Sequence, residues 1–320
     1  MRLIDNQVTE YIQEPGIDGV YSAIQRAAHI CYQTDTSKSK LSPKEFVDKV
    51  ILEKAHGRAL EFGTVYLQTP FFLDKDDEKR EFPWNRIAER YLTNPYSRLK
   101  LVDFGSNNDA HDFYFLITSN MRVIMQGDYE SEEEAWENHY DKNWLKDLYY
   151  LCEPTEHHYK RRTFSIVLSR GASDDLRTHI TLSSMCESTR FCNYSKGKYG
   201  NQLTGIKPYW IDFKNSGDIE VKTYHDGSVD NEQVRALGED DYQFVMSMAL
   251  EEMEYMRNAE IGLQPQQLKR LFPLWGKCEL RLCGFDDAWD NFMWRRLDGH
   301  ADPECTKVAK LIQNLRENVI

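Results

Sequence analysis

Strand-like and helix-like patterns occupy different parts of this chain, and their arrangement limits the folds open to it. Runs of β-branched and aromatic residues over 63–67, 112–117 and 164–168 predict strands. Apolar residues that recur with a period of 3.6 predict long amphipathic helices at about 240–261 and 302–319. Strands followed by long helices favour an α+β fold, in which an antiparallel or mixed sheet is flanked by helices.

Two further helices are predicted near the start of the chain. The first spans about 19–33, where apolar residues follow the helical period. The second begins at Ser42, because Ser42, Pro43 and Glu45 supply the N-cap, the first-turn proline and the acidic third residue of a capping box.

Composition and charge exclude several classes of protein. With 41% hydrophobic and 12% aromatic residues, the 320-residue chain has an ordinary globular composition. Its net charge of −12 disfavours nonspecific binding to nucleic acid or to an anionic membrane. No apolar run approaches the roughly 18 residues of a membrane helix, and the opening residues lack a signal-peptide pattern. We therefore expect a cytoplasmic protein that binds neither nucleic acid nor membranes.

Cysteines and short motifs give little direct evidence of catalysis. The seven cysteines form no CxxC pair, so free thiols in a reducing compartment are expected. The sequence contains no glycine-rich dinucleotide motif, Walker loop or nucleophile elbow. His56 and Glu61 have a spacing compatible with a metal pair, but two ligands without a third are weak evidence for a metal, and none is predicted.

An acidic stretch interrupts the chain at about 71–162. Between Asp128 and Asp147 it carries eight acidic residues and two lysines, a net charge of −6. Such a run is typical of a solvated helix face, and its aromatic residues argue against a disordered loop. We interpret the stretch as a structured insertion in a single domain that spans 1–320.

Two basic segments stand out against this acidic background. Residues 177–198 hold four basic residues and one acid, a net charge of +3, together with many hydroxyl groups. Arginine and hydroxyl donors suit a phosphate, although a polar helix paired with acids elsewhere would have the same composition. Near the C-terminus, Arg295 and Arg296 follow an apolar helix, so one should face inward. A buried arginine requires a paired anion, which an internal salt bridge could also supply.

Five segments together resemble the flavin-dependent thymidylate synthases, or thymidylate synthase complementing proteins. The motif of that family is Arg-His-Arg, seven residues, Ser, any residue, Arg. The matching frame here is Thr178-His179-Ile180, seven residues, then Ser188-Thr189-Arg190. The four further segments follow in the family's order: RAAHICY (26–32), HGRALEFGTVYL (56–67), PQQLKRLFP (265–273) and NFMWRRLDGHADPE (291–304).

The resemblance implies the fold of that family, an activity and a set of site residues. The activity is transfer of a methylene group from methylenetetrahydrofolate to dUMP, with FAD as the hydride carrier, NADPH as the reductant and a homotetramer as the working form. Ser188 and Arg190 would bind the dUMP phosphate, Arg296 the nucleotide, and Lys269 would come from a neighbouring subunit. Glu187 and Asp175 complete the dUMP set. The FAD set implied by the resemblance is His56, Arg58, Glu61, Arg177, His179, Asn291 and His300.

The sequence also departs from the family pattern. Thr178 and Ile180 replace both motif arginines, and Arg177 lies one position early, about 100° away on a helix. Phe62 stands where the family has histidine, and Arg58 occupies a small-residue position. Three hypotheses follow: a divergent synthase, a nucleotide-binding paralogue with impaired catalysis, and an acidic scaffold whose insertion recruits a protein partner.

Overall fold

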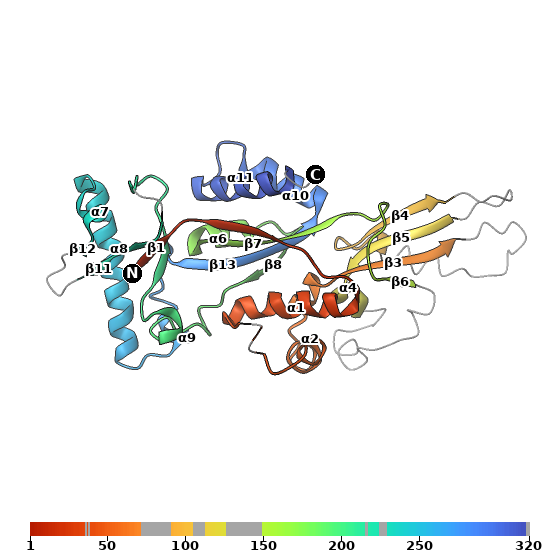
Figure 1. Cartoon of the computed structure of the whole chain (residues 1–320), viewed down its shortest axis with the longest axis horizontal. Coiled ribbons are helices and arrows are strands. Elements are labelled where there is room, and N and C mark those ends of the chain that lie inside the picture. Colours follow the sequence, from red (N-terminus) through yellow and green to blue (C-terminus); the bar gives the residue numbers. More distant parts are fainter. Residues whose placement is uncertain are drawn as a thin grey trace, which may run out of the picture.

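Four antiparallel or mixed sheets and the helices around them make up the described part of the chain (Figure 1). The computed structural model describes residues 1–35, 37, 39–71, 91–104, 113–125, 149–214, 217–223 and 229–317. The architecture is α+β, as the sequence predicts. Within the described residues, no helix combines the length and apolar character needed to cross a membrane.

The central sheet has the strand order β2-β7-β13-β8, and all its pairs are antiparallel. Its strands are β2 (Gln7–Tyr11), β7 (Arg161–Ser169), β13 (Lys277–Phe285) and β8 (Ser183–Cys186). Strand β13 was not predicted. Its buried residues alternate with Lys277, Glu279 and Arg281. These charged residues made the two-residue alternation of a strand hard to recognise in the sequence.

One face of the central sheet is covered by α6 (Arg170–Leu176), α10 (Asp286–Arg296) and α11 (Pro303–Glu317). Figure 1 shows α10 and α11 lying along this face. Trp289 of α10 is fully buried and meets Phe164 of β7 edge-to-face, with ring centroids 4.9 Å apart. This packing fixes the end of α10 beside the end of α6.

The opposite face is covered in part by α1 (Gly16–Tyr32), which lies below the sheet in Figure 1. Gly63 has no side chain, which lets α1 pack closely against the backbone at this position. A Cβ atom there would lie 2.7 Å from Val20 Cγ1 and 2.8 Å from Ile24 Cδ1, so a larger residue would push α1 away.

The second predicted helix forms with the expected cap. Ser42 and Glu45 make a reciprocal capping box, and Pro43 occupies the first turn of α2 (Pro43–Phe46). The helix continues as a wider π-helical turn, η2 (Val47–Leu52), and a 3-10 helix, η3 (Gly57–Phe62), follows. The prediction of this helix start is confirmed.

A second sheet contains β4 (Arg98–Asp103), β5 (Phe113–Asn120), β3 (Thr64–Phe71) and β6 (Tyr149–Leu151), in that order, and α4 (Met121–Met125) follows β5. These described parts of the predicted insertion are regular structure. The acidic run 128–147 lies outside the described residues, and the domain boundaries stay a prediction.

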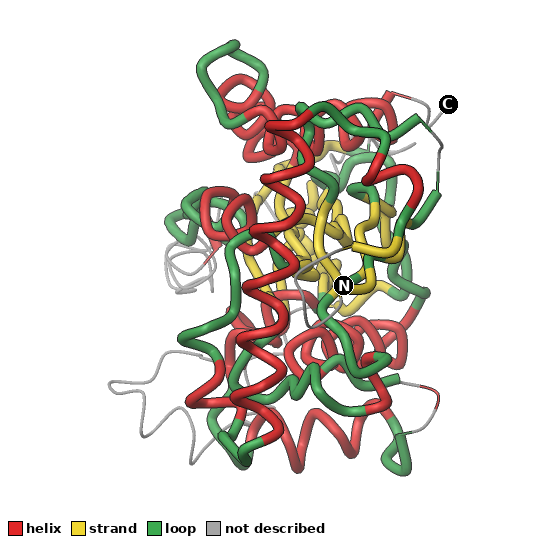
Figure 2. The backbone as a smooth tube through the Cα atoms, turned by 90° about the vertical axis from the view of Figure 1, so that its left-hand side faces the viewer, coloured by secondary structure: helices red, strands yellow, loops and turns green. Residues whose placement is uncertain are grey.

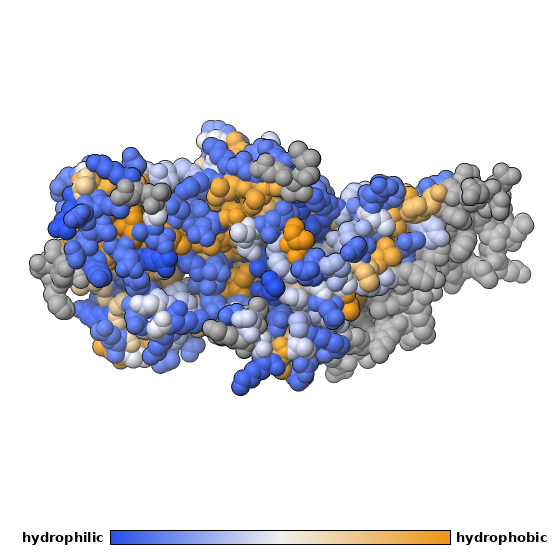
Figure 3. All heavy atoms as spheres, in the orientation of Figure 1, coloured by the Kyte–Doolittle hydropathy of each residue, from blue (hydrophilic) through white to orange (hydrophobic). Residues whose placement is uncertain are grey.

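A third group of elements lies at the left of Figure 1. Long helix α8 (Glu239–Glu260) crosses it, and Figure 2 shows this helix in front of the strands. The shorter elements are β1 (Arg2–Ile4), η6 (Gly197–Tyr199), β9 (Thr204–Ile206), β10 (Ile219–Glu220), β11 (Lys222–Thr223), β12 (Val229–Asp230), α7 (Glu232–Arg235) and α9 (Pro265–Leu268). In the space-filling view of Figure 3, the surface at the left of the molecule is mostly hydrophilic.

Candidate functional site

The ends of α6 and α10 bring together a cluster of polar groups. Arg296, the last residue of α10, donates from Nε to His179 Nε2 over 2.9 Å. Its terminal nitrogen Nη2 donates to the Asp175 carbonyl at 2.6 Å and to Thr178 Oγ1 at 3.4 Å. Asp175 and Arg296 of the expected dUMP set and His179 of the expected FAD set are therefore neighbours.

The cluster shows which protein groups hold Arg296. An anion, either a ligand or an internal acid, is expected at the inward-facing arginine of this pair. Arg296 does face inward while Arg295 is exposed, but its hydrogen-bond partners are a neutral imidazole, a carbonyl and a hydroxyl. No salt bridge between described residues therefore neutralises Arg296, and the anion expected at this arginine stays a prediction. The guanidinium keeps an edge available because it is only half-buried.

His179 is held as a neutral base. Burial lowers its pKa to about 4, and the charges of Arg296 and Arg295 act in the same direction. The ring is 7% exposed and packs on Phe292, with centroids 4.7 Å apart. Because Nε2 accepts from Arg296, the proton of the neutral ring lies on Nδ1.

The residues around His179 in the motif face outward. Arg177 is exposed and forms an ion pair with Asp174 at 3.1 Å. Thr178 Oγ1 donates to the Asp175 carbonyl at 2.7 Å, which ends the helix locally. Ile180 is 84% exposed, an unusual surface position for a large apolar side chain. Neither position where the family has arginine carries a positive charge.

Glu187 directly follows β8, and its carboxylate forms hydrogen bonds and an ion pair with other residues of the chain. It is 2% exposed and accepts hydrogen bonds from Tyr194 Oη at 2.7 Å and from the Glu279 backbone N–H at 3.0 Å. Lys277 Nζ forms an ion pair with it at 3.1 Å. Its carboxylate therefore positions the loop that follows β8.

Ser188 and Arg190 lie in that loop. The Ser188 backbone N–H donates to the Cys31 carbonyl at 3.1 Å, so the end of α1 holds the loop. Arg190 is exposed, its guanidinium lies 5.7 Å from the centre of the Phe191 ring, and it forms no ion pair within the described ranges. Its guanidinium is free to bind an anion.

The expected FAD residues of the 56–61 segment lie on and beside η3. His56 is exposed and caps η3 at its start. Arg58 is exposed, donates to Ser184 Oγ at 3.2 Å and makes no ion pair with any residue that the structure describes. Glu61 is 3% exposed and is paired with Arg122. Only His56 and Arg58 of these three are available to a ligand.

The remaining predicted site residues lie on the surface. Asn291 is exposed on α10, His300 is exposed after it, and Lys269 is exposed at the end of α9. None of the hydrogen bonds or ion pairs between described residues joins Arg296 to Ser188, Arg190 or Lys269. Within one chain, the expected site residues thus form separate clusters. The described residues also contain no group of three or more side chains that could hold a metal.

Sequence reasoning missed a pair of thiols beside the motif. Cys186 of β8 and Cys278 of β13 are free, with sulfur atoms 3.3 Å apart, and Arg170 Nη1 contacts Cys186 Sγ at 3.4 Å. The hydrogen bond from Cys278 lowers the pKa of the Cys186 thiol to about 7 although burial opposes this. The two cysteines are 92 residues apart, so no local spacing could reveal them.

A family model described as thymidylate synthase complementing protein matches residues 107–320, about two thirds of the chain. The chain belongs to this family. The matched range contains the motif around His179 and the segments 265–273 and 291–304, whereas 26–32 and 56–67 precede it. No curated protein matches the sequence.

Two solved structures illustrate what this family member is similar to. Thymidylate Synthase X from Helicobacter pylori, with FAD and dUMP, is 18% identical at a TM-score of 0.33, over 48% of this chain and 66% of that chain. A UMP/dUMP methylase, PolB, from Streptomyces cacaoi, bound with 5-Br UMP, is 17% identical at a TM-score of 0.36, over 50% of this chain and 70% of that one. This chain therefore spans just under two thirds of the Helicobacter protein.

Proposed function

We propose that the chain is a divergent flavin-dependent thymidylate synthase that methylates dUMP. The observation that carries this proposal is the family match, because it includes the motif segment whose His179 and Arg296 are neighbours in the structure. The proposed carbon donor is methylenetetrahydrofolate and the proposed reductant is NADPH. A cytoplasmic homotetramer would bring Ser188 and Arg190 of one subunit and Lys269 of a neighbouring subunit to one site.

The proposed dUMP residues have distinct tasks. Arg190 and Ser188 bind the phosphate, because Arg190 is exposed and has no ion pair in the described chain. Arg296 orients the nucleotide, while His179, neutral at pH 7, accepts a hydrogen bond from Arg296 Nε and holds the guanidinium in place. Asp175 contributes its carbonyl to the same arrangement.

The chemistry of the donor set fits a flavin dinucleotide through Arg58. This arginine is exposed and lacks a carboxylate partner among described residues, so it can pair with the diphosphate of FAD. His56, Asn291 and His300 are exposed polar groups that would complete the set, whereas Glu61 is occupied by Arg122. Bound FAD supplies the hydride that completes the methyl group.

One feature supports a second candidate function, a nucleotide-binding paralogue without flavin chemistry. Thr178 and the 84% exposed Ile180 supply no cation where the family has two. The deciding experiment incubates the purified full chain with FAD, dUMP, methylenetetrahydrofolate and NADPH, and follows dTMP by mass spectrometry. The proposal expects dTMP only when all four are present. dUMP binding without dTMP, in a protein that lacks the flavin absorbance at roughly 450 nm, would support the paralogue instead.

A further inference from the structure

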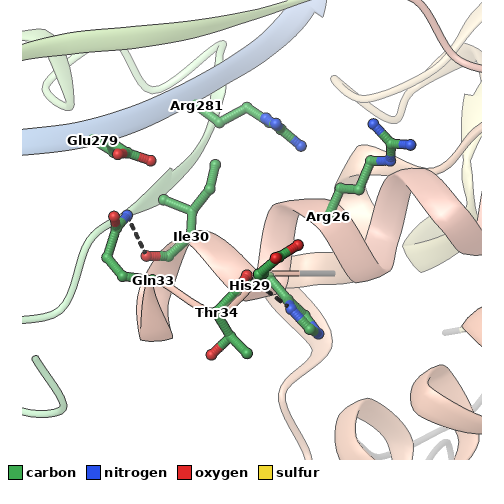
Figure 4. A pocket seen from close by; sticks show the side chains of 8 residues that line it. Arg26, His29, Ile30, Gln33, Thr34, Glu279 and Arg281 are labelled. Carbon is green, nitrogen blue, oxygen red and sulfur yellow. Dashed lines mark hydrogen bonds between the residues drawn. The ribbon is translucent and has the colours of Figure 1, made fainter. Parts of the chain in front are cut away.

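A polar cavity between α1 and β13 is lined by two arginines that form no ion pair with any described residue. Its volume is about 420 Å³, and Arg26, His29, Gln33, Glu279 and Arg281 are among the residues that line it. Figure 4 shows the guanidinium groups of Arg26 and Arg281 directed toward the same space from the helix and from the strand. None of these residues belongs to the proposed dUMP or FAD sets.

The cavity lies on the sheet face that α1 leaves partly uncovered. Arg281 pairs across the sheet with Ser165, to which its Nε donates at 2.9 Å, and the next strand presents the exposed Thr9 beside it. Arg281 lies 5.0 Å from the centre of the Tyr11 ring, and Arg26 lies 5.6 Å from the same ring. The two cations therefore share one aromatic neighbour.

The local acids are already occupied. Glu279 accepts from Lys277 Nζ at 2.8 Å, and this pairing lowers the pKa of Glu279 against the effect of burial. Asp35 Oδ1 accepts from the backbone N–H and the hydroxyl of Ser37. Across the described residues, neither Arg26 nor Arg281 takes part in an ion pair. The Glu279 carboxylate acts on Arg281 only at longer range, so both arginines lack a direct ion-pair partner in this part of the chain.

Arg281 shows this deficit most clearly. Its Nη1 atom is buried and has no hydrogen-bond partner. Burial lowers the pKa of Arg281, and the charge of Arg26 also lowers it. Arg281 as a whole is half-buried, but a buried N–H donor on a charged group is costly unless an acceptor approaches it, and an arginine remains charged in proteins. The missing partner is therefore an anion that enters from solvent.

The geometry indicates the chemistry of this anion. Two guanidinium groups that converge from separate elements suit the several oxygens of a phosphate better than the two of a carboxylate. The cavity is within the roughly 300–1,000 Å³ range of small-molecule sites and is much larger than a phosphate ion needs. Gln33 and Glu279 are among the other lining residues and offer hydrogen-bonding groups to hydroxyls.

We propose that the cavity between α1 and β13 binds a small sugar phosphate, with Arg26 and Arg281 holding the phosphate and the Gln33 and Glu279 side contacting hydroxyl groups. This site goes beyond the proposed synthase activity and does not depend on it.

The test is calorimetric titration of the full chain with ribose 5-phosphate in a phosphate-free, low-salt buffer. Inorganic phosphate and ribose serve as the two halves of the probe. We expect ribose 5-phosphate to bind one per chain, inorganic phosphate to bind more weakly, and ribose not to bind. Arg26→Gln and Arg281→Gln should each weaken ribose 5-phosphate about tenfold or more, as loss of a charge-assisted hydrogen bond would.

Arg190→Gln is the matched control, because it removes an exposed arginine from the proposed dUMP site. It should leave ribose 5-phosphate binding unchanged, and its effect on dUMP tests the proposed function separately. Arg26 is exposed, so its variant should fold even if Arg281→Gln does not. Absence of binding to the parent protein, or weakening by Arg190→Gln alone, would overturn the proposal. So would variants that leave binding unchanged but dissociate an oligomer in sedimentation, since the arginines would then pair with a second copy.

Discussion

Arg296 and His179 form a donor–acceptor pair, and this pair fixes the protonation state of the histidine. The guanidinium donates from Nε to Nε2 of the ring at 2.9 Å. A protonated imidazole has no acceptor nitrogen, so protonation of His179 would break this bond and set two positive charges against each other. Burial and this arginine, which lies 117 positions later in the chain, together keep the histidine at the centre of the family motif neutral.

Stability should depend on pH through His179. Its pKa is about 4 in the folded chain and ordinarily 6.5. Below pH 6.5 the unfolded chain takes up a proton that the folded chain refuses, so stability present above pH 6.5 is lost as the pH falls toward 4. The loss should be on the order of 2 kcal/mol. His179→Gln keeps an acceptor for Arg296 but does not titrate. Urea unfolding at pH 7 and pH 5 should show a smaller difference for this variant than for the parent, and equal differences would contradict the pairing.

Arg190 should contribute strongly to nucleotide affinity. Arg190→Ala removes an exposed cation that has no ion pair among the described residues. We expect it to weaken dUMP by about 2 kcal/mol, or about 30-fold, because a charge-assisted hydrogen bond to phosphate is lost. Calorimetry with dUMP measures this, and Arg257→Ala, a surface arginine paired with Glu254 on α8, is the control. Unchanged affinity in the Arg190 variant would remove this residue from the site.

Restoring the motif arginines should have unequal effects at the two positions. Ile180 is 84% exposed, so Ile180→Arg can be accommodated and should tighten FAD. Thr178 Oγ1 lies 3.4 Å from Arg296 Nη2, so Thr178→Arg sets two cations together and should destabilise the chain unless an anion binds. Arg58→Ala should lose FAD more readily than the parent. Flavin absorbance after gel filtration measures retention, and equal retention in all three variants would contradict the proposed FAD site.

Glu187 should matter for stability more than for binding. Glu187→Gln removes a buried charge that Lys277 and Tyr194 share, and leaves Lys277 with only Glu279. We expect a loss of about 2 kcal/mol in the free energy of unfolding, since breaking a buried ion pair leaves an uncompensated charge. Glu279→Gln is the control, because its side chain is 36% exposed and its loss should cost less. Urea unfolding that shows no difference between the two variants would contradict this role.

Local sequence signals predicted part of the fold well. The cap at Ser42 and Pro43 and the periods of α1, α8 and α11 involve neighbouring residues, so the sequence alone reveals them. Strand β13 escaped notice because its charged residues face α1 and the cavity, where only the folded chain explains them.

The site was harder to predict, because its contacts join distant residues. The resemblance assigned Arg296 to the dUMP set and His179 to the FAD set, but the direct contact between them and its neutral character depend on folding and burial that no motif encodes. The resemblance places Glu187 in the dUMP set, yet its partners Lys277 and Glu279 come from a strand about 90 residues away. Whether a carboxylate binds a ligand or an internal lysine is therefore decided by tertiary structure.

The last prediction concerns the reactivity of Cys186. Its thiol has a pKa of about 7 against an ordinary 9.0, because Cys278 donates a hydrogen bond to it and Arg170 adds a favourable charge. Since the thiolate is the nucleophile, alkylation by iodoacetamide should rise through pH 7 and level off above it. Cys278→Ala removes the donor, so the pKa rises and alkylation at pH 7 should slow about tenfold. Cys278→Ser keeps a donor and should react nearly as fast. Peptide mass spectrometry distinguishes Cys186 from the exposed Cys152, and equal rates in the alanine and serine variants would show that the hydrogen bond does not activate the thiol.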